Sequence, residues 1–112
     1  MMTDFATFLA DSRALVERGL SLMERKAHDY ADAQDPFVNF KTAAKAASIT
    51  PPQAILTLIG MKVARLTQLI ATEKRPLNES VEDSLVDLIN YTLLLRGVLK
   101  EQPTADVPPQ KI

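Results

Sequence analysis

The stretch Asn78 to Tyr91, NESVEDSLVDLINY, places acidic and apolar residues on opposite sides of a helix. At about 100° per residue, four polar side chains fall within roughly 80° of one another on the helical wheel. These four are Glu79, Asp83, Asp87 and Asn90. The apolar residues between them recur at helical spacing, which predicts a buried side. We therefore expect an amphipathic helix with an acidic flank.

Three further amphipathic segments precede this helix, and none of the chain alternates like a strand. The first predicted helix runs from a Thr3 cap to about Ala27, and the second from Asp35 and Pro36 through Ala47. The third runs from a Thr50 cap and Pro51 to near Lys74, and the fourth from Asn78 or Ser80 to about Lys100. A cap residue followed by proline is typical of a helix start. In the third helix, the predicted buried positions are Ile55, Leu58, Ile59, Leu66, Leu69 and Ile70. Because the connections are short, we expect an all-α, small four-helix bundle.

The composition limits the domain organisation and the partners. With 112 residues, the chain forms one domain, which we place at residues 1–100, followed by a flexible, proline-rich tail at 101–112. The net charge of −1 argues against a nucleic-acid partner, and the absence of cysteine excludes thiolate chemistry. No segment is expected to approach a membrane-spanning run of about 20 apolar residues, so we expect a cytoplasmic protein with no membrane partner. On the fourth predicted helix, Val86, Leu93 and Leu94 lie partly outside the main core stripe, and this surplus apolar surface predicts a homodimer or higher homo-oligomer.

The acidic flank has two interpretations. Carboxylates four residues apart stand about 5–6 Å from each other at Cβ, so they can converge on one Mg²⁺ ion. Alternatively, the acids form a solvated face, because negative charge near a helix N-terminus is favourable. Asp87 and Asn90 lie beyond the first turn, where that benefit is lost and where Asp and Asn are mediocre helix formers. We therefore expect these two residues to have a specific partner.

A basic pair in the third predicted helix could complement these acids. Lys62 and Arg65 are three residues apart and share one face. They either bind phosphate oxygens or neutralise Asp83 and Asp87 as ion pairs. The residues themselves leave both alternatives open.

Taken in series, four segments carry a family resemblance: KAHDY, NF at Asn39–Phe40, MKVARL and NESVEDSLVDLINY. In this order they resemble a group of small phage and prophage proteins that includes the nucleotide-modification-associated domain family. That group looks like a divergent branch of the MazG-like, all-α nucleotide pyrophosphohydrolases. The similarity covers roughly residues 22–99.

The resemblance implies a magnesium-dependent enzyme that hydrolyses the α–β phosphoanhydride of a nucleoside triphosphate or modified nucleotide. It implies Asp83 and Asp87 as metal ligands, and Glu79 as a further ligand or as the catalytic base that orients the water. Glu24 is the acid of the first predicted helix that we expect to complete the metal site. The resemblance also implies a nucleotide site formed by Lys62, Arg65, Asn90, Tyr91, Asp29 and Tyr30.

The chain departs from the enzymes' pattern in two elements. Its last helix spaces the aspartates four residues apart, where the enzymes favour a spacing of three, and the larger departure lies in the first predicted helix. The enzymes present a Glu-x-x-Glu pair on an earlier helix, whereas Glu17 and Glu24 are seven apart here. Either Glu24 and Asp29 substitute from another register, a second subunit contributes acids, or the protein binds a nucleotide without hydrolysing it. Three hypotheses therefore remain: a pyrophosphohydrolase, a non-catalytic nucleotide binder, and a structural bundle with internal ion pairs.

Overall fold

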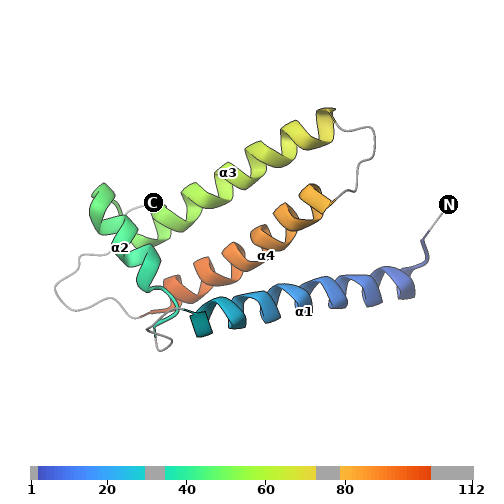
Figure 1. Cartoon of the computed structure of the whole chain (residues 1–112), viewed down its shortest axis with the longest axis horizontal. Helices are drawn as coiled ribbons and strands as arrows, with labels where there is room; N and C mark the ends of the chain where they lie inside the picture. Colours follow the sequence, from blue (N-terminus) through green and yellow to red (C-terminus); the bar gives the residue numbers. More distant parts are fainter. Residues whose placement is uncertain (1–2, 30–34, 73–78, 102–112) are drawn as a thin grey trace.

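The structure is a computed structural model that describes residues 3–29, 35–72 and 79–101 (Figure 1). Within these ranges the chain forms four helices and no strand. The helices are α1 (Phe5–Asp29), α2 (Val38–Ala47), α3 (Pro51–Thr72) and α4 (Glu79–Lys100). The prediction of a small all-α bundle is confirmed. The end predicted for the third helix near Lys74 lies outside the described residues, as does the proline-rich tail beyond Glu101.

The helix starts follow the polar residues that precede them, with two corrections. The second helix was predicted to begin at Asp35 and Pro36, but α2 begins at Val38. The reason is that Asp35 and Pro36 belong to a turn in which the Asp35 carboxylate accepts from the backbone N–H of Phe37. Thr50 and Gln53 form a reciprocal capping box, because each backbone N–H donates to the other's side-chain oxygen, at 2.9 and 3.3 Å. At the start of α1 the predicted cap was Thr3, but Asp4 Oδ1 accepts from the backbone N–H of Thr7 at 2.7 Å. A carboxylate is the better acceptor at this positive end of the helix.

Helix α4 occupies the centre of the molecule. It packs against α3 on one side and α1 on the other, while α2 crosses α3 near its start (Figure 1). Among the described residues, α1 contacts no helix other than α4. The first helix is therefore held along one face only, and its N-terminal part extends away from α2.

A compact apolar cluster holds α2, α3 and α4 together. It consists of the buried residues Phe37, Ile55 and Val98, with Phe40, Ile59, Tyr91, Leu94 and Leu95 packed around them. Gly97 is needed here, since a Cβ at that position would lie 2.7 Å from Cζ of Phe37. The small residue lets the aromatic ring lie against the backbone of α4, next to the start of α2.

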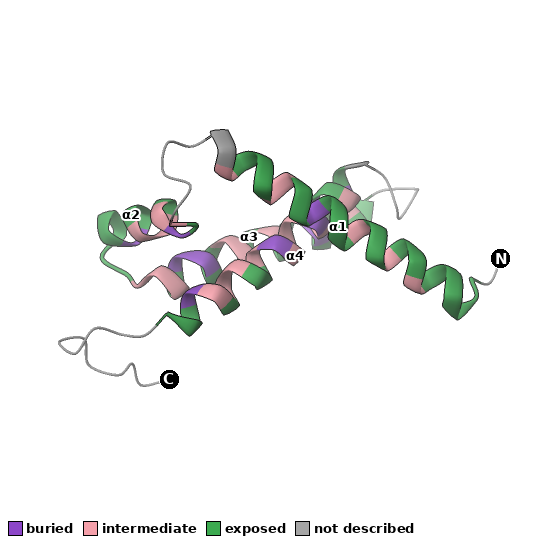
Figure 2. Cartoon of the chain, turned by 90° about the horizontal axis from the view of Figure 1, so that it is seen from below, coloured by how far each residue is buried: buried purple, intermediate pink, exposed green. Residues whose placement is uncertain are grey.

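Outside this cluster, burial is sparse, and α1 and α2 are mostly exposed (Figure 2). Ile70, predicted to be buried, is 59% exposed, because the side of α3 that carries it faces away from α4. Helix α3 is also long and apolar enough to cross a membrane, with a mean hydropathy of 1.5 and only 17% of that window buried. This corrects the expectation that no segment would approach such a composition.

Candidate functional site

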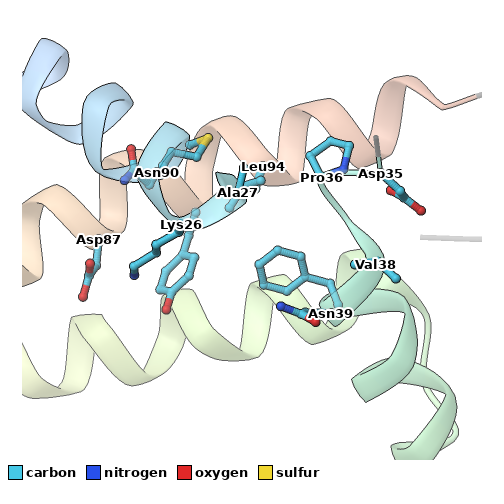
Figure 3. Close-up of a pocket in the computed structure, with 12 residues that line it drawn as sticks. Lys26, Ala27, Asp35, Pro36, Val38, Asn39, Asp87, Asn90 and Leu94 are labelled. Carbon is cyan, nitrogen blue, oxygen red and sulfur yellow. The ribbon is translucent and has the colours of Figure 1, made fainter. Parts of the chain in front are cut away.

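A cavity of about 240 Å³ opens between the C-terminal end of α1, the start of α2 and the middle of α4. Its polar lining comes from Lys26, Asp35, Asn39, Asp87, Asn90 and Tyr91. Its apolar lining comes from Met23, Ala27, Pro36, Val38, Phe40 and Leu94. Lys26 and Asp87 lie on one side of the cavity, and Asn39 lies on the other (Figure 3). No residue of α3 lines it.

Asp87 connects this cavity to α3. Its Oδ2 accepts from Nζ of Lys62 at 2.8 Å, and the two side chains are only 26% and 27% exposed. Of the two roles open to Lys62, neutralising an acid of α4 is the one observed. The partial burial makes this pair less screened by water than a surface ion pair.

Asp83 lies elsewhere, although it is only one helical turn from Asp87. Its Oδ1 accepts from Nη2 of Arg18 at 2.8 Å, and Glu82 lies 3.8 Å from the same guanidinium group. Asp83 does not line the cavity, and its side chain is 55% exposed. The acidic flank is thus divided between a cation of α1 and a cation of α3.

The predicted magnesium ligands are therefore not brought together among the described side chains. Glu24 is exposed and does not line the cavity. Within the described ranges, no three Asp, Glu or His residues come close enough to hold a metal ion. The side chains of Asp29 and Glu79, and all of Tyr30, lie outside the described residues, so their predicted roles concern a part that the structure does not describe.

Asn90 lines the cavity and joins α4 to α1. Its Nδ2 donates to the backbone oxygen of Gly19 in α1 at 2.9 Å, and the residue is 8% exposed. Its Oδ1 is buried without a hydrogen-bond partner, and a Cβ at Gly19 would lie 2.9 Å from it. Asn90 was predicted to face a nucleotide; it lines the cavity, but its donor group is used to hold α1 against α4.

Val86 belongs to the same helix crossing. It was predicted to lie outside the core stripe of the fourth helix, yet it is only 2% exposed. A Cβ at Gly19 would lie 3.6 Å from its Cγ1, which places the valine against α1. The surplus apolar surface predicted at Val86 is therefore covered within the chain.

Among the polar residues that line the cavity, Lys26 and Asn39 were not assigned a role from the sequence. Both lie in segments that carry the family resemblance, KAHDY and NF, and this is the signal that could have identified them. Arg65, in contrast, was expected to meet phosphates but is exposed and does not line the cavity. Tyr91, which was also predicted to face a nucleotide, does line the cavity.

At the rim of the cavity, Asp35 organises the entry into α2. Its Oδ1 accepts from the backbone N–H of Phe37 at 2.9 Å, and its Oδ2 accepts from Nζ of Lys41 at 3.0 Å. These two hydrogen bonds lower the pKa of Asp35 below its ordinary value, the backbone bond more than the lysine. The pKa of Lys41 is raised, first by Asp35 and then by Glu101. Both groups stay charged at neutral pH and keep the rim in place.

A small helical bundle with a polar-lined cavity between three helices is the class of protein that this geometry defines. The chain belongs to the family described as nucleotide modification associated domain 1, whose model matches residues 26–95, more than half of the chain. The match begins at Lys26 and ends just beyond Leu94, so it contains eleven of the twelve cavity-lining residues, all except Met23. No curated protein and no solved structure shows a significant match.

Proposed function

We propose that the chain binds a nucleotide or a nucleotide-derived small molecule in the cavity between α1, α2 and α4. The observation that carries this proposal is the position of Asp87, Lys26 and Asn39 around a cavity of about 240 Å³ in the segment matched by the nucleotide-associated family. Binding pockets combine a mainly apolar lining with a few convergent polar groups, and this cavity has both.

The lining suggests which part of a nucleotide lies where. Phe40, Leu94 and Tyr91 provide flat and apolar surface for a base, while the Asn39 amide can pair with its polar edge. Lys26 supplies positive charge for phosphate oxygens. The cavity is smaller than pockets of about 300–1,000 Å³ that enclose whole ligands. We therefore expect it to enclose one end of the nucleotide and to leave the other end at the opening.

Magnesium enters this proposal together with the nucleotide. Mg²⁺ retains several waters and is commonly bound by one or two carboxylates plus the phosphates of a ligand, so it does not require a cage made only of protein groups. Of the two described carboxylates that line the cavity, Asp35 holds the start of α2 in place, so Asp87 is the one available to a metal ion. A Mg²⁺–nucleotide complex would compete with Lys62 for Asp87 and leave the ammonium group free to meet a phosphate.

The second candidate is the finer activity implied by the resemblance, hydrolysis of the α–β phosphoanhydride of a nucleoside triphosphate. Asp87 on the cavity wall favours it, because metal-assisted phosphate chemistry needs at least one such carboxylate. A catalytic base would also be required, and Glu79 is our proposal for it. Binding without hydrolysis needs only the side chains that already line the cavity, and we therefore place binding first.

Calorimetric titration of the full chain with nucleoside mono-, di- and triphosphates, with and without Mg²⁺, tests the proposal. Lys26→Ala should weaken nucleotide binding by about tenfold or more, as expected for loss of a charge-assisted contact. Lys45→Ala is the matched control, because Lys45 is exposed on α2 and does not line the cavity. Equal effects of the two variants, or no binding of any nucleotide, would contradict the proposed site. Release of pyrophosphate in the same samples would decide between binding and hydrolysis.

A further inference from the structure

The three glycines of the chain differ in what surrounds them. Gly19 lies against Asn90 and Gly97 lies against Phe37, so each allows a close contact within the chain. Gly60, in the middle of α3, has nothing within 4 Å of the position that a Cβ would occupy. Glycine inside a helix costs stability relative to alanine. Among the residues that the structure describes, no contact accounts for that cost at Gly60.

Gly60 lies on a continuous exposed stripe of α3. The stripe, which we call the α3 seam, consists of Leu56, Gly60, Val63, Thr67 and Ile70, and all five residues are exposed. Their spacing alternates between four and three residues, which is the heptad spacing of helices that pack along each other. The Thr67 hydroxyl donates to the backbone oxygen of Val63 at 2.8 Å, so its polar group is already paired within the helix.

The α3 seam carries no charge. The two charged residues of α3 are Lys62 and Arg65, and neither belongs to the seam. Lys62 pairs with Asp87 of α4, and at about 100° per residue Arg65 lies roughly opposite Leu56. An uncharged surface of this kind meets no electrostatic repulsion from an identical surface, whereas a charged partner would gain nothing from it.

We propose that the α3 seam binds the α3 seam of a second copy of this chain. Val63 lies at the middle of the seam, so it meets its own counterpart whether the two helices run parallel or antiparallel. In an antiparallel pair, Leu56 faces Ile70 of the partner, and Gly60 faces the small Thr67. The absence of a side chain at Gly60 then lets the two backbones approach closely, which accounts for the glycine.

The exposed area of the α3 seam is of the size expected for a small interface between two copies. Within the α3 seam, Leu56, Val63 and Ile70 are large and apolar, and they are 57%, 50% and 59% exposed. Together they expose roughly 300 Å², and the exposed residues beside them on α3 extend the patch towards about 500 Å² per partner, at the low end of specific interfaces. An apolar patch of this size on a small protein typically marks an interaction site.

A lipid bilayer is a less suitable occupant, although α3 is long enough to span one. The opposite side of α3 packs against α4 and α2, and it buries Ala54, Ile55 and Leu66. Spanning would separate Lys62 from Asp87 and place its charge in hydrocarbon, which is unfavourable. A second copy covers the seam and leaves these contacts unchanged. It also leaves the cavity open, because no residue of α3 lines it.

Sedimentation of the full chain over a range of concentrations tests the proposal. The wild-type chain should sediment as a dimer, and Val63→Glu should raise the dimer dissociation constant at least 100-fold, because two buried glutamates would face each other. Leu93→Glu is the matched control, since Leu93 is a similarly exposed apolar residue on α4. A monomeric wild-type chain, or a dimer broken by Leu93→Glu but not by Val63→Glu, would overturn the proposal. So would co-flotation of the wild-type chain with phosphatidylcholine vesicles as a monomer.

A cysteine pair keeps the test valid if Val63→Glu does not fold. The chain contains no cysteine, so one introduced thiol can form a disulfide only with another copy. Under mild oxidation, Val63→Cys should give a covalent dimer at micromolar concentration, and Leu93→Cys should stay largely monomeric on a denaturing gel. Cross-linking at position 93 and not at 63 would place the interface on α4 and contradict the proposal.

Discussion

The two halves of the polar flank of α4 resemble each other in sequence and differ in surroundings. Asp83 is 55% exposed and pairs with Arg18 of α1, whereas Asp87 is 26% exposed, pairs with Lys62 of α3 and lines the cavity. One turn further along, Asn90 is buried against Gly19. Residues on one side of a helix can thus face different neighbours, because the flanking helices diverge along α4. Exposure, more than residue type, should therefore determine what each side chain contributes.

The largest effect is expected at the buried end of the flank. Asn90→Asp replaces the amide donor by a carboxylate next to the Gly19 carbonyl oxygen, and the free energy of unfolding should fall by about 2–4 kcal/mol at pH 7. Asn39→Asp makes the same chemical change at an exposed position of the same cavity and should have little effect. Urea unfolding followed by circular dichroism at fixed protein concentration measures both. A similar loss in the two variants would show that burial is not what distinguishes Asn90.

An intermediate effect is expected at Asp87. Asp87→Ala leaves the half-buried Lys62 without its partner and should destabilise the fold by about 1–2 kcal/mol. The double variant Lys62→Met/Asp87→Leu should recover most of that loss, because it removes both charges from a partly apolar contact. Failure of the double variant to recover stability would contradict the view that the unpaired lysine causes the loss.

The exposed end of the flank should contribute little. Asp83→Ala breaks a surface pair with Arg18 and should change the free energy of unfolding by less than about 0.5 kcal/mol. The same variant should keep nucleotide binding, whereas Asp87→Ala should reduce the magnesium dependence of binding. Paired titrations with and without Mg²⁺ measure this difference. An Asp83 variant that loses magnesium dependence would show that both carboxylates act at one site.

The smallest effect is expected from acid titration at the rim. Because the folded-state pKa of Asp35 lies below its ordinary value of 3.8, its contribution to stability is complete above that value and is lost as the pH falls through the folded-state pKa. The difference in stability between wild type and Asp35→Asn should therefore shrink below about pH 4. Unfolding curves between pH 2.5 and 6 test the sign, and a difference that grows on acidification would contradict it.

Much of the secondary structure was predictable because its signals are local. Thr50 and Gln53 form their capping box within one turn, and Pro51 opens α3 as expected. Periodicity also identified Ile55 and Leu66 as buried. It could not identify Phe37, whose burial depends on Gly97, sixty residues away. Nor could it show that Ile70 faces outward, because α3 has apolar residues on more than one side.

The candidate site was predictable only in part. The sequence indicated that Asp87, Asn90 and Tyr91 share a functional region, and all three line the cavity. It also grouped Asp83 with Asp87 on one helical face, whereas the structure pairs them with different helices. Which cation neutralises which acid depends on helix packing, and spacing along a single helix contains no such information.

By itself, the sequence determined four amphipathic helices and the cap at Thr50, since these properties depend on neighbours within a few positions, and the order of four short segments indicated the family. Only the tertiary structure decided that α4 lies between α1 and α3, that Asn90 joins α1 to α4, and that the cavity includes Lys26 and Asn39. The physical reason is that a periodic pattern shows only whether a helix face is apolar or acidic. Which surface covers that face depends on contacts between residues that are far apart in the chain.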